Sequence, residues 1–260
     1  MRDERRRAVV TGASGGIGAA FAARLARDRY DLILVARSRA RLEAQAKRLR
    51  KEAEVAVVVA DLTDPADLKR LEPKVSAERR LDLLVNNAGF GTTGAFARLD
   101  PDREEEEIRL NVVALVRLTR AALPNMLARS QGAIINVSSM AAFQPGPYNA
   151  TYSATKAFVN AFTEALHEEL DGTGVRVQAL CPGLTRTGFQ KRAGIDTSRF
   201  PSFVWMTPEA VVEASLAALE RGGVICVPGL ANRALVELAG TVPRSVTRRV
   251  AAVLGRRFLG

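Results

Sequence analysis

Short apolar runs rich in β-branched residues alternate with longer segments of helical periodicity along most of the chain. These runs are apolar on both faces, as a parallel sheet covered by helices requires. Seven strands are predicted, at residues 8–11, 31–36, 55–60, 81–86, 132–138, 174–180 and 223–227. Helices are predicted near 17–29, 39–52, 65–78, 102–129, 151–171 and 208–221. The alternation predicts an α/β fold with one doubly wound parallel sheet and helices on both of its faces.

The helix start at Asp100 is the clearest one in the sequence. Asp100 suits the N-cap position, Pro101 the first helical position, and several acids fill the first turn. The run Glu104–Glu107 is interpreted as the solvated beginning of this helix rather than as an interaction patch.

A glycine-rich turn joins the first predicted strand to the first predicted helix. Its residues include Gly12, Ser14, Gly16, Ile17 and Gly18, with the glycines spaced G-x-x-x-G-x-G. At such a turn, backbone N–H groups and the positive end of the helix dipole bind a pyrophosphate. Glycines also mark ordinary strand-to-helix turns, so the turn alone leaves a purely structural role open.

A tyrosine and a lysine one helical turn apart form the strongest chemical signal. Tyr152 and Lys156 share one face of the predicted helix 151–171, and Ser139 lies thirteen residues before the tyrosine. A phenol titrates near 10, so it transfers protons poorly at neutral pH unless its pKa is shifted. The Lys156 ammonium is expected to lower the pKa of Tyr152. Beside a dinucleotide turn, this pair predicts proton exchange with a carbonyl or alcohol while a nicotinamide carries the hydride.

Taken in order along the chain, the motifs resemble those of the short-chain dehydrogenase/reductase superfamily, whose fold is Rossmann-like. The matching segments are Thr11–Gly18, Asp61-Leu62, Asn86–Gly89, Asn111, Ser138-Ser139, Tyr152–Lys156 and Pro182–Thr187. The stretches after Lys156 and at Leu166–Glu169 are also similar to 3-oxoacyl-thioester and 17β-hydroxysteroid-type reductases.

The resemblance implies a role for each catalytic candidate. Tyr152 would donate the proton in reduction or accept it in oxidation, and Lys156 would lower its pKa and hold the cofactor ribose. Ser139 would hydrogen-bond the carbonyl oxygen, which contributes positioning. Asn111 would hold a water that links Lys156 to solvent. Ser138 competes for the serine role, but the family's offset from the tyrosine selects Ser139.

The residues after the second predicted strand address the choice of cofactor. Folds that prefer NAD place an acid at this position to bind the ribose 2′-hydroxyl. Here the sequence reads Ala36-Arg37-Ser38 and has no carboxylate. Arg37 can pair with a 2′-phosphate and Ser38 can donate a hydrogen bond, which favours NADP(H) over NAD(H). The alternative is that Arg37 is an ordinary loop cation.

Further cofactor contacts follow from the resemblance alone. They are Asp61 and Leu62 at the adenine, Asn87, Ala88 and Gly89 on the ribose and adenine side, and Pro182, Gly183, Thr185 and Thr187 beside the nicotinamide. No group of histidines, cysteines or acids has the spacing of metal ligands, so no metal site is predicted.

An irregular segment at 188–207 follows the nicotinamide motif and is rich in aromatic residues, including the only tryptophan, Trp205. Such a segment suggests a lid over an apolar substrate, and packing onto the core is the alternative. The opposite wall was assigned to Phe90, Phe143, Pro145 and Tyr148. Three cations of the lid, Lys191, Arg192 and Arg199, are candidates for binding an acidic carrier such as a phosphopantetheine thioester.

The formal charge of +10 is concentrated near the two ends of the chain. Residues 1–230 are predicted to form the catalytic domain, and 231–260 a basic helical extension. The extension alternates apolar and basic residues, so weak contact with an anionic membrane surface is one interpretation and a solvated surface another. No nucleic-acid reader motif accompanies the charge, and no nucleic-acid partner is expected.

The remaining features predict a cytoplasmic enzyme. No apolar run is long enough to span a bilayer, the first seven residues are unlike a signal peptide, and Cys181 and Cys226 are interpreted as buried thiols. The predicted function is NADPH-dependent reduction of a carbonyl on an apolar substrate, such as a 3-oxoacyl thioester. The alternatives are an NADP-linked dehydrogenase of a sugar, steroid or other secondary alcohol, and a cofactor-sensing binding protein. A homodimer or homotetramer through 102–129 and 151–171 is implied by the resemblance.

Overall fold

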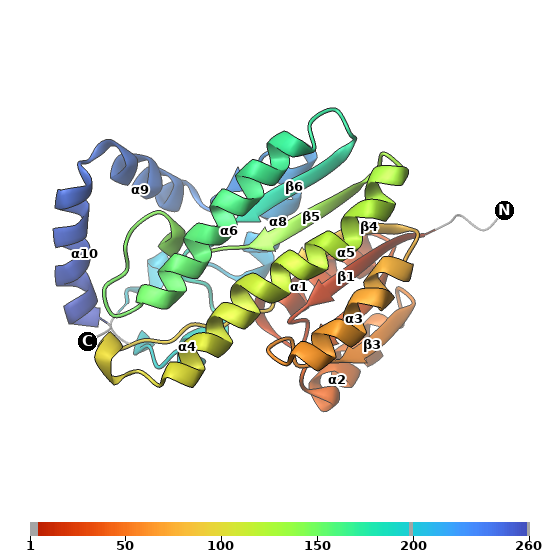
Figure 1. Ribbon diagram of the computed structural model, residues 1–260, viewed down its shortest axis with the longest axis horizontal. Helices are drawn as coiled ribbons and strands as arrows, with labels where there is room; N and C mark the ends of the chain where they lie inside the picture. The colour runs from red at the N-terminus through yellow and green to blue at the C-terminus, as the bar shows by residue number, and fades with distance from the viewer. Residues whose placement is uncertain (1–4, 198–199, 259–260) are drawn as a thin grey trace.

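The computed structural model describes residues 5–197 and 200–258 and is built on a seven-stranded parallel sheet (Figure 1). The strands lie in the order β3-β2-β1-β4-β5-β6-β7. Their bounds are β1 Arg6–Thr11, β2 Tyr30–Ala36, β3 Val55–Val59, β4 Leu81–Asn86, β5 Gly132–Val137, β6 Val175–Leu180 and β7 Ile225–Cys226. Each predicted apolar run forms one of these strands, and the predicted fold class is confirmed.

Helices cover both faces of the sheet (Figure 1). One apolar core joins the sheet to α1 Gly16–Arg27, α2 Arg39–Leu49 and α8 Pro208–Glu220. A second core joins it to α3 Pro65–Ala77, α5 Leu115–Ala128 and α6 Ala150–Glu169. Successive residues of a strand point to opposite faces, so Val9 belongs to the second core and Val10 to the first. This is why the central strands are apolar on both faces.

The segment predicted as one helix over 102–129 contains an irregular turn. It consists of α4 Pro101–Ile108, a π-helical turn η2 at Arg109–Ala114, and α5. The predicted start is confirmed, because the Asp100 carboxylate accepts a hydrogen bond from Asp102 N at 3.0 Å and Pro101 is the first helical residue. A π-helical turn adds a residue to the helix and often marks a functional site. Asn111 lies in this turn.

The strand order places the functional residues at one edge of the sheet. After β3 the chain crosses back to β4, so β1 and β4 are neighbours whose onward connections diverge. Ligands bind at such a switch point, beyond the carboxyl ends of the strands. The glycine-rich turn follows β1, Asn87 follows β4, Ser138 and Ser139 follow β5, and Pro182 follows β6.

The C-terminal extension forms two helices, α9 Leu230–Thr241 and α10 Arg244–Phe258. They lie at one end of the molecule, outside the helix–sheet layers (Figure 1). The lid segment contains a short helix α7 Phe189–Arg192 and a 3₁₀ turn η5 Ser202–Val204. Among the helices in the described part of the chain, none has the length and apolarity needed to cross a membrane.

Candidate active site

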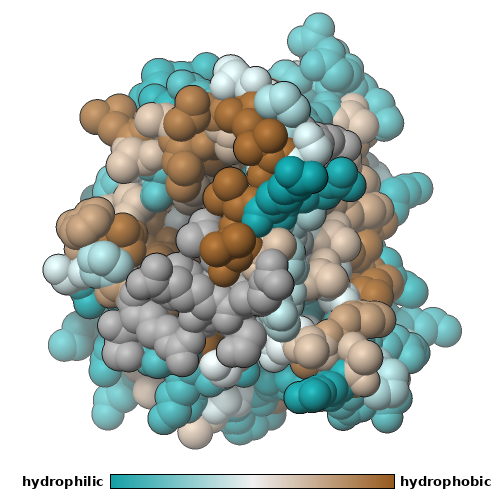
Figure 2. Space-filling model, turned by 90° about the vertical axis from the view of Figure 1, so that its left-hand side faces the viewer, coloured by the Kyte–Doolittle hydropathy of each residue, from teal (hydrophilic) through white to brown (hydrophobic). Residues whose placement is uncertain are grey.

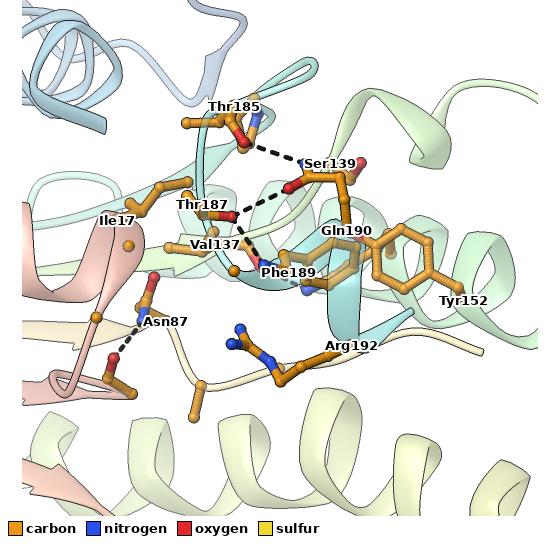
Figure 3. Close-up of a pocket in the computed structure, with 18 of the residues that line it drawn as sticks. Ile17, Asn87, Val137, Ser139, Tyr152, Thr185, Thr187, Phe189, Gln190 and Arg192 are labelled. Carbon is orange, nitrogen blue, oxygen red and sulfur yellow. Dashed lines mark hydrogen bonds between the residues drawn. The ribbon is translucent and has the colours of Figure 1, made fainter. Parts of the chain in front are cut away.

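A cavity of about 810 Å³ extends along the carboxyl edge of the sheet, from the glycine-rich turn to α6 (Figure 3). Nearly all of the predicted site residues line it. They are Gly12, Ser14, Gly16, Ile17, Arg37, Ser38, Asp61, Leu62, Asn87, Ala88, Gly89, Ser139, Tyr152, Lys156, Pro182, Gly183, Thr185 and Thr187. Gly18 and Asn111 do not line the cavity. Gly18 packs against Gly12, and Asn111 hydrogen-bonds Phe90.

The glycine-rich turn has backbone angles and close contacts that favour glycine. Gly12 and Gly16 have φ of 65° and 56°, in the left-handed region. A methyl group on Gly16 would lie 3.1 Å from Cγ2 of Thr187, a residue of the predicted nicotinamide motif. Asn87 Nδ2 donates to Thr11 O at 2.8 Å and fixes the turn against the end of β4. The turn therefore leaves exposed backbone at the start of α1, which suits a pyrophosphate.

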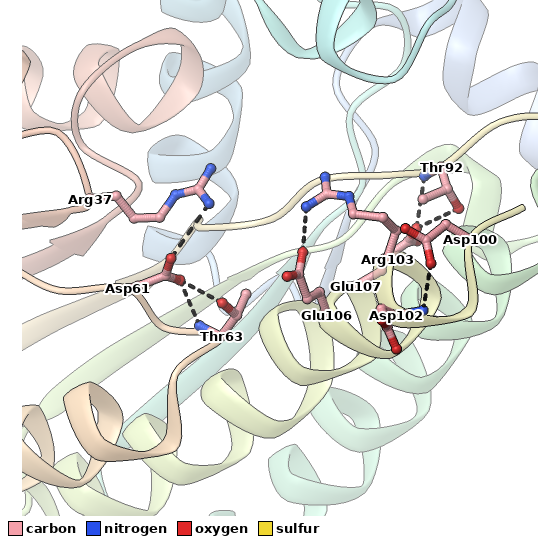
Figure 4. A network of polar contacts seen from close by, with 9 residues as sticks. All are labelled: Arg37, Asp61, Thr63, Thr92, Asp100, Asp102, Arg103, Glu106 and Glu107. Carbon is pink, nitrogen blue, oxygen red and sulfur yellow. Dashed lines mark hydrogen bonds and ion pairs between the residues drawn. The ribbon is translucent and has the colours of Figure 1, made fainter.

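Arg37 and Asp61 lie together at the other end of the cavity, with an Nη1–Oδ2 distance of 3.6 Å (Figure 4). The Asp61 carboxylate also accepts hydrogen bonds from Thr63 N and Oγ1. Burial acts to raise the pKa of Asp61, but these hydrogen bonds and the charge of Arg37 bring it below its usual value. Ser38 caps α2, its Oγ accepting from Arg41 N at 3.4 Å.

Two further arginines line this end of the cavity, Arg41 on α2 and Arg192 on the lid helix α7. Burial, and then repulsion from Arg41 and Arg37, lower the pKa of Arg192. A cluster of cations in a cavity wall suits an anionic ligand. Of the three lid cations assigned to an acidic carrier, Arg192 thus lies in the cofactor cavity (Figure 3), Lys191 is exposed, and Arg199 lies outside the described residues.

Tyr152, Lys156 and Ser139 converge at the centre of the cavity. Lys156 is 5% exposed, its Nζ donates to Val137 O at 2.8 Å, and it lies 5.7 Å from the centre of the Tyr152 ring. The Ser139 hydroxyl acts to lower the pKa of Tyr152. Ser138 Oγ instead donates to the backbone oxygen of Lys156 at 3.0 Å, which supports a structural role for Ser138.

The pKa of Tyr152 shifts in the direction opposite to the one predicted. Burial raises it to about 12, the hydrogen bond with Ser139 lowers it, and the charge of Glu107 raises it. The charge of Lys156 is not among the causes of this shift, since Lys156 loses its proton at a lower pH than the phenol does. Burial also lowers the pKa of Lys156 to about 8. Tyr152 is therefore a neutral phenol at neutral pH, which is the form that donates a proton.

Asn111 is held by protein groups on both sides of its amide. Its Nδ2 donates to Phe90 O at 2.9 Å and to Thr155 Oγ1 at 3.1 Å, and its Oδ1 accepts from Phe90 N at 3.2 Å. The π-helical turn therefore ties the segment after β4 to the catalytic helix α6. The water that Asn111 would hold stays a prediction.

The short chain dehydrogenase family model matches residues 6–197. The chain belongs to the short-chain dehydrogenase/reductase superfamily. It is 35% identical over 219 residues to the very-long-chain 3-oxoacyl-CoA reductase of Anas platyrhynchos, covering 82% of this chain and 68% of that protein. It is 34% identical over 222 residues to an uncharacterised oxidoreductase of Staphylococcus saprophyticus, covering 82% of this chain and 91% of that one.

Solved structures of the same superfamily have the same fold as this chain. A short-chain dehydrogenase from Sphingobium yanoikuyae in complex with NADPH has a TM-score of 0.82 and 38% identity, covering 92% of this chain and 97% of that one. The bulky-bulky ketone specific alcohol dehydrogenase from Comamonas testosteroni has a TM-score of 0.78 and 32% identity, covering 92% and 96%. The enzyme is therefore a nicotinamide-dependent oxidoreductase. The glycine-rich turn and the cluster of Arg37, Arg41 and Arg192 fit such a cofactor.

Some of the aromatic side chains in segment 188–207 line the cavity, and others do not. Phe189, Phe200 and Val204 line the cavity, and the Phe189 ring centre lies 5.5 Å from that of Tyr152. Trp205 packs edge-on against Phe200 at 6.2 Å, whereas Phe203 is 85% exposed. The segment thus places apolar side chains beside Tyr152, and its role as a substrate lid stays a prediction.

The wall opposite the lid was assigned incorrectly. None of Phe90, Phe143, Pro145 and Tyr148 lines the cavity. Phe90 lies under the Arg103 guanidinium, and Phe143 packs against a small core around Ala179. Met140, Ala141 and two residues of α9, Asn232 and Leu235, line the cavity. Asn232 touches Gly183, because a methyl group there would lie 2.8 Å from its Nδ2.

The C-terminal helices of the enzyme present apolar side chains to solvent (Figure 2). The most exposed are Leu230, Leu235 and Leu238 on α9, and Val246, Val250 and Val253 on α10. Arg248 and Arg249 are also exposed on α10. An apolar face beside cations is compatible with an anionic membrane surface. That contact stays a prediction, tested by pelleting with anionic vesicles at low salt.

Proposed function

We propose that this enzyme uses NADPH to reduce the carbonyl of an apolar substrate to a secondary alcohol, with 3-oxoacyl thioesters as the leading substrate class. One observation carries the proposal. The Tyr152 ring packs against the Phe189 ring of the lid, so the acid–base group lies where the cofactor cavity meets an apolar cover. The lid residues Phe189, Phe200 and Val204 offer no hydrogen-bonding side chain to a substrate, which suits an apolar substrate better than a sugar.

The residues suggest how the reduction proceeds. The hydride for the carbonyl carbon would come from a bound nicotinamide. Tyr152 donates its phenolic proton to the carbonyl oxygen, and Ser139 hydrogen-bonds that oxygen and positions it. Lys156, charged below its pKa of about 8, stabilises the phenolate that remains until a proton returns from solvent. At neutral pH the phenol is protonated, so Tyr152 can donate its proton in the direction of reduction.

The preference for NADPH rests on the cations at the adenosine end of the cavity. Arg37, Arg41 and Arg192 would surround a 2′-phosphate, and Ser38 would donate a hydrogen bond to it. The Sphingobium yanoikuyae dehydrogenase, which is in complex with NADPH, supports this choice.

Replacing Arg37 by leucine is expected to weaken NADPH binding by about 10- to 100-fold, because a hydrogen bond to a charged group contributes about 1.5–3 kcal/mol. NADH binding should change little, since NADH has no 2′-phosphate. Fluorescence titration with both cofactors measures the two dissociation constants. Arg39→Leu is the matched control. Arg39 lies two residues after Arg37, at the first position of α2, and does not line the cavity. Equal losses for NADPH and NADH would contradict the assignment.

The substrate class is tested by following NADPH absorbance with a panel of carbonyl compounds. The panel contains acetoacetyl and longer 3-oxoacyl thioesters, a steroid ketone and bulky aromatic ketones, with NADP⁺ and secondary alcohols for the reverse direction. The relatives named 3-oxoacyl-CoA reductase and bulky-bulky ketone specific alcohol dehydrogenase support the first and last choices. Intact NADPH binding without turnover of any compound would favour a cofactor-sensing protein instead.

We also propose that the enzyme is a homodimer or homotetramer in the cytoplasm. The helices expected to pair carry exposed apolar side chains at Ile108, Val113, Leu127 and Phe158. Unpaired helices of this kind are commonly covered by a second subunit. Both cysteines are free and buried, in keeping with a reducing compartment. Light scattering after size exclusion gives the subunit number.

A further inference from the structure

Two carboxylates of α4 are buried, although the catalytic steps above use neither. Glu107 is 0% exposed and Glu104 is 8% exposed, one helical turn apart. Oε1 of each is buried and has no hydrogen-bond partner. Burying a carboxylate costs free energy unless the charge is compensated nearby. The position of Glu107 therefore calls for a cation or a structural task.

Glu107 holds the end of the segment 89–92, which follows β4. Its Oε2 accepts hydrogen bonds from both Thr92 N and Thr92 Oγ1, each at 2.8 Å (Figure 4). One helical turn further on, Asn111 accepts from Phe90 N and donates to Phe90 O. Two side chains of the α4–η2 helix thus fix both ends of this four-residue segment.

The segment lies directly against the catalytic pair. A methyl group on Gly91 would be 2.8 Å from Cδ2 of Tyr152. One on Gly89 would be 3.5 Å from Nζ of Lys156 and 2.9 Å from Oδ1 of Asn111. Moving the segment would therefore move the side chains on which proton transfer depends.

The charges around Lys156 also include that of Glu107. Burial lowers the pKa of Lys156 to about 8, and the negative charge of Glu107 raises it against this effect. Cys181, the other group that acts on it, has a pKa raised to about 12 by burial and is a neutral thiol at neutral pH. Of these two groups, Glu107 is therefore the one whose negative charge acts on the buried ammonium.

The titratable groups that face Glu107 come from two helices. Glu104 is on its own helix, and Tyr152 and Lys156 are on α6. Segment 89–92 contains no titratable side chain. Burial raises the pKa of Glu107 to about 7, Thr92 lowers it, Glu104 raises it and Lys156 lowers it. Arg103 of the same helix is directed at Glu106 and Phe90.

We propose that Glu107 is a positioning residue: its buried carboxylate is the counter-charge of Lys156 and fixes segment 89–92 against the catalytic helix. The kinetic part of this proposal rests on the proposed reductase function, and the electrostatic part does not. Glu107 touches neither substrate nor cofactor, so it acts through Lys156 and the position of Tyr152.

The kinetic test is the pH profile of kcat for NADPH-dependent reduction. In the wild type, the rate should decline above about pH 8, as Lys156 loses its proton. Glu107→Gln keeps the size of the side chain and an acceptor for Thr92 but removes the charge. Its alkaline limb is expected to move down by about one pH unit, the usual effect of one nearby charge. Glu105→Gln, at an exposed position of the same helix, should leave the limb unchanged.

A milder variant covers the case in which Glu107→Gln does not fold. Thr92→Val removes one hydrogen bond that favours the ionised form of Glu107 and so raises its pKa. The alkaline limb should then move in the same direction by a smaller amount. An alkaline limb that stays in place in the folded variants would overturn the proposal.

A cofactor-free measurement separates this proposal from the proposed function. Thermal unfolding at pH 7.5 is compared for Glu107→Gln, Lys156→Met and the double variant. If the two charges compensate each other, the double variant loses less Tm than the sum of the single losses. Strictly additive losses would refute the pairing. Non-additive losses in a protein that reduces no compound of the panel would keep the pairing and reject the reductase function.

Discussion

Replacing Tyr152 by phenylalanine is expected to lower kcat for carbonyl reduction by about 10²- to 10⁴-fold, the usual contribution of a positioned general acid. Only the hydroxyl is lost, because the ring that packs against Phe189 at 5.5 Å is retained. The dissociation constant for NADPH should therefore remain nearly unchanged. Single-turnover oxidation of NADPH measures the chemical step, and fluorescence titration measures cofactor binding.

Tyr148→Phe provides the matched control for this experiment. Tyr148 lies four residues earlier, lines no part of the cavity and packs beside Gly255 of α10. Its replacement should leave kcat within the error of the wild-type value. A Tyr152→Phe enzyme that kept more than about a tenth of the wild-type rate would show that another group supplies the proton.

The framework of the fold could be predicted because its signals are local. Each strand is a short apolar run, and Asp100-Pro101 marks a helix start by its own side chains. The glycine-rich turn could likewise be predicted, since Gly12, Gly16 and Gly18 lie close together in the sequence at one strand–helix junction. Ser139, Tyr152 and Lys156 were identified by their spacing, and the structure gathers all three in one cavity.

What sequence reasoning missed depends on contacts between distant segments. The run Glu104–Glu107 was interpreted as solvated, yet the first and last residues of the run are buried because they share the face of α4 that packs on α6. Arg192 and Asn232 reach the cavity only because the lid and α9 fold back over it. The π-helical turn at Asn111 has no sequence signature that a helical periodicity count detects.

The wrong sign for the pKa of Tyr152 has the same origin. An i, i+4 lysine predicts a lowered pKa if the lysine still carries its charge when the phenol ionises. In the folded chain both groups are buried, which raises the pKa of Tyr152 and lowers that of Lys156. Burial in the folded chain therefore determines the pKa of Tyr152, which helical spacing alone predicted incorrectly.

Replacing Gly18 by alanine is expected to damage both the stability of the fold and the binding of NADPH. A methyl group at Gly18 would lie 2.5 Å from Gly12 O and 2.5 Å from Nδ2 of Asn87, so the turn must move. Overpacking of this kind costs about 1–3 kcal/mol, or about 2–10 °C in Tm for a chain of this size. Displacement of the turn should weaken NADPH binding at least about 10-fold, since each lost charge-assisted hydrogen bond contributes about 1.5–3 kcal/mol.

Gly15→Ala tests whether close contact, rather than loss of a glycine, causes the loss of stability at Gly18. Gly15 immediately precedes α1, its φ of 175° is open to any residue, and a methyl group there would have no neighbour within 4 Å. The Tm of Gly15→Ala without cofactor should therefore equal that of the wild type. The new methyl group meets the Gly12 carbonyl and the Asn87 amide in Gly18→Ala and nothing in Gly15→Ala, so equal Tm values would show that these contacts do not constrain the turn.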